Sequence, residues 1–303
     1  MKFCLKLFLS AAVLFYGLSY TGAAFAQDES SVSEKLSSIG FGKSSNKDVK
    51  TEIVEFFGEL DKCSDSANMH KLKSFFSKDF INNDGFDYSL YMKSVKDGAK
   101  LITNRKSKTE ISDIEVFENY VIVHAVEYGE AETLKESDDK LGKGIIIIKA
   151  DVYYTLQKEG RNWKILSANV VDEICKMLFG EAKNIYFFLN TPMGVKEDAE
   201  YTATLSFQLP SGCVAMSSIS SEPIIYPVPQ NRDVFKAVNK EGVLERIFRA
   251  NTANHNEYAI ASVGITKPEL ISEGTVNVRL VGTAYILKRV NVYSCSKNTK
   301  GNK

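Results

Sequence analysis

The stretch GIIIIKADVYYTLQKEGRNWKILSANV, residues 144–170, decides the fold of this chain of 303 residues. In its first half, apolar residues that share one face recur at every second position: Ile146, Ile148, Ala150, Val152, Tyr154 and Leu156. This period of two predicts a β-strand with that face buried, and Lys149 and Asp151 on the face toward solvent or an interface. The turn residues 158–161 then predict a hairpin into a second strand that begins at Trp163.

A second pair of predicted strands precedes this hairpin. Lys108–Phe117 and Tyr120–Glu130 alternate in the same way and are joined at Glu118-Asn119. A polar loop at 134–143 links the two pairs. The four strands together are typical of an antiparallel meander.

Three segments before the meander show helical spacing instead. The first begins at Asn46, the second covers residues 69–80 and the third covers residues 87–100. The apolar stripe of the first consists of Val49, Ile53, Phe56, Phe57 and Leu60. Three helices followed by a meander indicate an α+β domain in which the helices cover one face of a curved sheet.

The runs MHKLKSFFSKDFINNDGFDYSLYMK (69–93) and EGRNWKIL (159–166), with the hairpins between them, carry a resemblance to a known family. Residues 46–173 resemble the nuclear transport factor two superfamily, also called ketosteroid-isomerase-like or polyketide-cyclase-like. The resemblance implies a cone-shaped, curved antiparallel sheet capped by the three N-terminal helices, with a pocket inside the cone. It implies the fold more than the function.

The implied pocket has aromatic lining candidates: Phe56, Phe57, Phe76, Tyr91, Tyr128 and Trp163. Aligned with the isomerases, Asp84 falls at the position of their catalytic base. Those enzymes also use a tyrosine and a protonated aspartate as oxyanion donors, and the first helix offers only phenylalanines at that place. In the context Asn-Asp-Gly, Asp84 is more typical of a turn residue.

His124 is the other weak catalytic candidate. It shares a strand face with Tyr120, Ile122, Val126 and Tyr128, and histidine is a common general acid or base. The sequence fixes no carboxylate or nucleophile beside it. A half-buried histidine bonded to a neighbour is the alternative that we favour.

Motifs for other chemistries are missing from the chain. It contains no CxxC, HxH or HExxH for a metal and no GxSxG for a nucleophile, so we expect neither a metal site nor a cofactor. Without residues 1–26 the formal charge is 36 minus 38, or −2. This balance gives no reason to expect nucleic acid as a partner.

The N-terminus has the pattern of a secretory signal peptide, with basic residues, a short apolar run and Ala24-Phe25-Ala26 before the cleavage site. We therefore expect residues 1–26 to be removed, the protein to be periplasmic or secreted, and no stable membrane insertion afterwards. Residues 27–45 read as a flexible leader.

Four cysteines remain after residue 26, an even number that favours two disulfides in an exported chain. Our hypothesis pairs Cys63 with Cys175 and Cys213 with Cys295. Buried free thiols are the alternative.

The domain at 46–178 is followed by a second, β-rich α+β unit at 179–296 and a polar, disordered tail at 297–303. Strands are predicted at 185–189, 201–209, 214–219, 224–228, 258–263 and 275–293. The exception is Asp233–Arg249, where the apolar spacing predicts a helix. We recognise no family in this unit.

The function predicted from these patterns is binding of an apolar small molecule or a protein partner without catalysis, by a protein that pairs with itself through its sheet. The alternative is a small-molecule enzyme of isomerase, cyclase or hydrolase type that works in the pocket of the first domain. An enzyme needs an enclosed cavity of about 300 Å³ or more with converging polar groups. The side of the sheet to which Asp84 and His124 point distinguishes the two.

Overall fold

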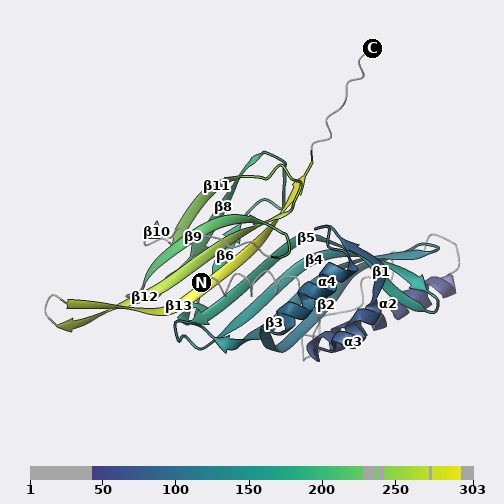
Figure 1. The fold of residues 1–303 in the computed structure, drawn as a ribbon, viewed down its shortest axis with the longest axis horizontal. Coiled ribbons are helices and arrows are strands. Elements are labelled where there is room, and N and C mark those ends of the chain that lie inside the picture. Colours follow the sequence, from purple (N-terminus) through teal and green to yellow (C-terminus); the bar gives the residue numbers. More distant parts are fainter. Residues whose placement is uncertain (1–42, 228–235, 238–241, 273–274, 295–303) are drawn as a thin grey trace, which may run out of the picture.

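The computed structural model describes residues 43–227, 236–237, 242–272 and 275–294 (Figure 1). The fold is mostly antiparallel sheet with few helices. The helices are α2 (Lys43–Asp65), α3 (Met69–Leu72) and α4 (Tyr88–Ala99). Single 3₁₀ turns lie at Lys73–Phe75 and Glu181–Asn184. No helix in the described part of the chain is both long and apolar enough to cross a membrane.

Helix α2 forms where the apolar stripe predicts it. Ile53, Phe57 and Leu60 are buried on its inner side. The helix begins at Lys43, so the predicted flexible leader is wrong in its last three residues. The remainder of the leader lies outside the described residues.

The predicted second helix is wrong from Phe76 onward, because only residues 69–75 are helical, as α3 and a 3₁₀ turn. After α3 and the 3₁₀ turn, the chain extends as β1 (Phe76–Asn82), which runs parallel to a strand of the meander and pairs Phe76 with Ile165. In the extended chain Phe76 and Phe80 both remain buried. The reason is tertiary, because the hydrogen bonds of a strand pairing are invisible to local spacing.

The meander consists of β2 (Ile102–Val116), β3 (Tyr120–Glu136), β4 (Lys143–Glu159) and β5 (Asn162–Gly180). The strands pair in chain order and antiparallel, as predicted. The predicted inner face of β4 is buried, with Ile146, Tyr154 and Leu156 at most 1% exposed. Helices α2 and α4 lie over this face (Figure 1).

The sheet does not end with the meander. Strand β5 pairs with β13 (Thr275–Tyr293), and the order continues through β12 (Glu257–Ser272) and β9 (Val214–Pro223) to β10 (Lys236–Ala237). The boundary predicted between residues 178 and 179 therefore lies inside β5. The two halves of the chain share one continuous sheet.

A smaller sheet of β6 (Phe187–Asn190), β8 (Glu200–Phe207) and β11 (Val243–Arg249) belongs to the second half. Its inner residues share a core cluster with residues of β9, β12 and β13: Phe187, Leu189, Ala203, Leu205, Ile219, Ala261 and Ile286. The short β7 (Gly194–Lys196) pairs parallel with the end of β13. This half is a β-sandwich that borrows one layer from the common sheet.

Two predictions in this half are wrong. The predicted helix at 233–249 is strand at 236–237 and 243–249, and its other residues, apart from Gly242, lie outside the described chain. Leu244 and Phe248 pack inward from β11 with the period of a strand. No strand forms at 224–227, and residue 228 is outside the described residues.

The predicted disulfide between Cys63 and Cys175 is also wrong. Both are free and buried, and the Cys63 thiol bonds the main-chain oxygen of Asn68 at 3.3 Å. Burial raises the pKa of both thiols. Cys213 is free within the described residues, and Cys295 and the predicted tail lie outside them.

Candidate functional site

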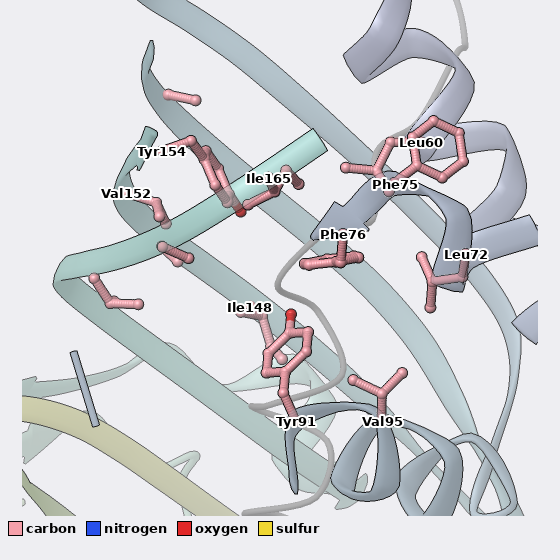
Figure 2. Close-up of a cluster of buried hydrophobic side chains, with 14 of the residues drawn as sticks. Leu60, Leu72, Phe75, Phe76, Tyr91, Val95, Ile148, Val152, Tyr154 and Ile165 are labelled. Atoms are coloured by element: carbon pink, nitrogen blue, oxygen red, sulfur yellow. The ribbon is translucent and has the colours of Figure 1, made fainter. Parts of the chain in front are cut away.

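A packed aromatic core lies between the helices and the buried face of the meander. Figure 2 shows Phe76, Tyr91, Tyr154 and Ile148 gathered between the helices and the sheet. The ring centroids of Phe76 and Tyr91 are 5.3 Å apart, and those of Phe57 and Tyr154 are also 5.3 Å apart. Three predicted lining residues, Phe57, Phe76 and Tyr91, thus meet inside the cone, where other side chains of the core surround them.

The other two aromatic candidates on this side lie at the rim. Phe56 is half-buried, with its ring centroid 5.2 Å from that of Phe75. Trp163 donates its indole N–H to Glu52 over 2.8 Å and carries the Lys158 ammonium 4.8 Å above its ring. Phe56 therefore packs α2 against the 3₁₀ turn at 73–75, and Trp163 links β5 to α2.

A buried carboxylate–tyrosine pair that the sequence analysis missed lies in this core. Glu127 is 2% exposed and accepts the hydroxyl hydrogen of Tyr154 over 2.5 Å. Close by, burial and the charge of Glu127 raise the pKa of Asp61 to about 8, against the hydrogen bonds that the side chain and main chain of Thr109 donate to it. Asp61 therefore holds a proton at neutral pH. The signal was available, because Glu127 falls on the buried positions of β3 beside Val121, Val123 and Ala125.

A second pair joins the two halves of the chain. Tyr258 of β12 donates its hydroxyl to Glu173 of β5 over 2.6 Å, and both are 1% exposed. Burial, and next the Glu173 charge, hold the pKa of Tyr258 well above its usual value. Burial likewise raises the pKa of Tyr91, with smaller contributions from Glu127 and Glu173. These tyrosines are neutral hydrogen-bond donors at any working pH.

Asp84 lies in the turn after β1 and forms a buried ion pair. Its carboxylate accepts two hydrogen bonds from the guanidinium of Arg289 in β13, at 2.5 and 3.2 Å, and one from Asn256 at 2.8 Å. The Asp84 side chain is 3% exposed and that of Arg289 is 0% exposed. The turn after β1 is thereby locked to the second half of the chain, as the turn interpretation of Asp84 predicts.

His124 and Tyr128 lie on the opposite face of the sheet from the packed interior, so they do not line a pocket on its inner side. The His124 ring stacks on Tyr153 with centroids 4.4 Å apart, and its Nε2 lies 2.6 Å from a carboxylate oxygen of Asp151. The half-buried, bonded histidine that we favoured is confirmed. Lys149 lies 5.5 Å above the Tyr128 ring, so it and Asp151 bind different neighbours.

Two adjoining hollows lie on this outer face, across β2, β3 and β4. Their volumes are about 480 and 240 Å³, and Lys106, Glu130 and Ile147 line both. The larger one is also lined by Asn104, Arg105, Glu132 and Ile145, and the smaller one by Lys108 and Tyr128. We call the two together the outer trough. It was not predicted, because its walls depend on a bulge of β2 between Thr103 and Lys106.

The outer trough combines an apolar floor with charges of both signs. Ile147 of the floor is 39% exposed. Lys108 forms an ion pair with Glu110, and Asn104 donates to Glu132 over 2.9 Å. Burial lowers the pKa of Arg105, whose guanidinium donates to the main-chain oxygen of Ala99. Such a surface can hold a partner by apolar contact and orient it by charge.

The described residues contain no group of three histidine, cysteine, aspartate or glutamate side chains placed to hold a metal ion.

Comparisons with known proteins give matches among solved structures. No protein-family profile matches the chain, and no curated protein does. A scytalone dehydratase-like protein of Novosphingobium aromaticivorans is 18% identical, with a TM-score of 0.38 over 43% of this chain and 87% of that one. A type 2 hexachlorocyclohexane dehydrochlorinase, LinA, is 11% identical, with a TM-score of 0.34 over 43% and 88%.

A nuclear transport factor 2-like superfamily protein of Salmonella enterica serovar Typhimurium is 16% identical, with a TM-score of 0.34 over 41% of this chain and 91% of that one. Each of these three matches covers 41–43% of this chain.

Proposed function

We propose that this protein is a non-catalytic binding protein that holds a stretch of a partner polypeptide in the outer trough. The observation that carries the proposal is the continuity of the two hollows, which share Lys106, Glu130 and Ile147 on one exposed face. The concave side of the same strands is occupied by core side chains. Exposed apolar surface with a charged rim is typical of a protein interface.

The position of the trough favours a polypeptide over a small molecule. It borders β2, the last strand in the order of the common sheet. The main-chain N–H groups of Ser107 and Thr109 on β2 already bond Asp65 and Asp61 of α2, so an extended peptide would lie across the outer face with its side chains in the two hollows. Lys106 and Glu130 at the shared wall then select the charge of the peptide.

The proposal includes export. The basic, apolar and small-residue pattern of residues 1–26 supports cleavage after Ala26. Mass spectrometry of the protein recovered from the periplasm or medium is expected to give Gln27 as the first residue. Recovery in the cytosol with Met1 retained would contradict export and leave the binding proposal standing.

The binding proposal is tested by selecting peptides from a displayed random library against the purified protein. Enriched peptides are expected to carry apolar residues beside charged ones and to lose binding at least tenfold in the variant Ile147→Glu. The matched control is Ile247→Glu, on β11, where the side chain is 67% exposed outside the trough. Equal loss in both variants, or no enrichment, would contradict the assignment.

A small-molecule enzyme remains the second candidate because of Asp61. A carboxyl group with a pKa of about 8 beside Glu127 and Tyr154 can donate a proton at neutral pH. Asp61 is half-buried, whereas Glu127 and Tyr154 are fully buried, so a substrate that contacted all three would have to displace core side chains. A screen of metabolite-sized ligands tests this candidate through the NMR signals of Tyr91 and Tyr154. A ligand that shifts the signals of both tyrosines would favour an enzyme, and a screen in which neither signal changes would count against it.

A further inference from the structure

The hairpin of β12 and β13 extends beyond the rest of its sheet. Strand β9 pairs with β12 only as far as Thr266, and β5 pairs with β13 only as far as Gly282. Beyond these points, the described residues 267–272 and 275–281 have no partner strand other than each other. Figure 1 shows the hairpin projecting from the body at the left of the view. We call these residues the arm.

The two faces of the arm differ in character. Directly opposed residues on one face are apolar, Leu270 with Val276 and Pro268 with Val278. The exposed fractions of Leu270, Val276 and Val278 are 75%, 55% and 60%. The other face carries the residues Lys267, Glu269, Asn277 and Arg279, with Arg279 3.1 Å from Glu269. The arm is therefore an amphipathic hairpin with its apolar side uncovered.

This arrangement is unusual for a chain that stays alone in water. Two strands by themselves are marginally stable, and a third strand or a packed face is needed to hold them. The arm has neither within the described residues. An exposed apolar face of this kind is typical of a surface that another molecule covers.

We propose that the apolar face of the arm packs on the same face of a second copy of this chain, forming a two-fold dimer. Each chain offers one such apolar face, while the ion-paired polar face stays in water. A two-fold pairing uses up both apolar faces and closes the assembly, so no fibre results. Two hairpins then make a small β-sandwich, with sheets about 10 Å apart.

The size of the face sets the strength of the dimer. The four apolar side chains of the face, Pro268, Leu270, Val276 and Val278, offer roughly 300 Å² per arm, or about 600 Å² in the pair. Stable standard interfaces bury roughly 1,200 to 2,000 Å². The dimer is therefore weak and forms reversibly as concentration rises.

The composition of the arm favours a second copy over a lipid surface. Its described residues include no aromatic side chain, and their formal charge is +1 from Lys267, Arg279 and Glu269. Interfacial membrane segments instead combine aromatic or large apolar side chains with several basic residues.

Sedimentation velocity of the purified protein from about 1 μM to about 1 mM tests the dimer. The wild type is expected to pass from monomer to dimer in this range, and Leu270→Lys/Val278→Lys to remain monomeric throughout. The control Asn277→Lys adds one positive charge on the polar face of the arm, is matched to the single variant Val278→Lys, and is expected to dimerise like the wild type.

A mixing experiment separates a docking role from damage to the fold. Val278→Lys and Val278→Glu are each expected to stay monomeric alone and to associate when mixed, since opposite charges then face each other. A wild type that stays monomeric over the whole concentration range overturns the proposal. So does a dimer that persists in Leu270→Lys/Val278→Lys but is lost in Tyr153→Lys, on the outer face of β4. Arm-dependent flotation of the monomer with vesicles of phosphatidylcholine and phosphatidylserine would likewise overturn it, in favour of a lipid surface.

Discussion

At the scale of single residues, the buried pair of Asp84 and Arg289 has the largest consequence. Removing one partner of a buried ion pair leaves a charge without compensation and costs about 3–5 kcal/mol. We expect Asp84→Ala to lower the free energy of unfolding by about that amount in urea titrations. Arg249→Met, which breaks an exposed pair with Asp198 and Glu200, is the control and is expected to change it little. Similar decreases in the free energy of unfolding in both variants would show that the Asp84–Arg289 pair does not hold the turn.

Asp61 gives the stability a pH dependence of defined sign. Its pKa is about 8 in the folded protein, against about 3.9 in an unfolded chain. Between these values the folded state holds a proton that the unfolded state has lost, so the free energy of unfolding falls as pH rises from about 4 to about 8. We expect Asp61→Asn to be more stable than the wild type at pH 8, by about 1–3 kcal/mol, and to match it near pH 4. If the free energy of unfolding changed with pH in the same way in the wild type and in Asp61→Asn, the raised pKa of Asp61 would be contradicted.

At the scale of elements, the turn into β11 interrupts the segment 233–249, whose apolar spacing predicted a helix. Gly242 has a φ of +66°, and a Cβ built on it would lie 1.9 Å from the main-chain oxygen of Phe207. We expect Gly242→Ala to destabilise the protein by about 2 kcal/mol or more in thermal or urea unfolding. Gly160→Ala is the matched control, with a φ of +65° and open space around it, and about 1 kcal/mol is expected there. Equal effects would mean that the clash is relieved.

At the scale of the whole molecule, the common sheet makes the two halves depend on each other. Tyr258, Ile260 and Leu287 of the second half lie in the core cluster of the first. We therefore expect the fragment 43–178 to lack near-ultraviolet circular dichroism and dispersed NMR signals, because it exposes the β5 edge and leaves Asp84 without Arg289. The full chain is expected to unfold in one transition. A fragment that unfolds cooperatively would show that the halves are independent.

The candidate site was the part of the molecule that the sequence predicted least well. Alternation along β4 identified which side chains enter the core, and the same rule applied to β3 would have identified Glu127. His124 and Tyr128 were assigned to a pocket although their positions alternate with Val123 and Ala125, which are buried. The outer trough had no local signal, since it depends on a bulge and on three strands lying side by side.

The sequence by itself determined the strands of the meander, the burial of one face of residues 144–157 and the course of α2, because the period of side chains along a strand or helix is a local property. Only the tertiary structure decided that β1 is a strand, that one sheet runs through both halves, and which carboxylates are neutralised. Asp84 and Arg289 are 205 positions apart in the chain. Their contact is a product of strand order, and no spacing within a segment encodes it.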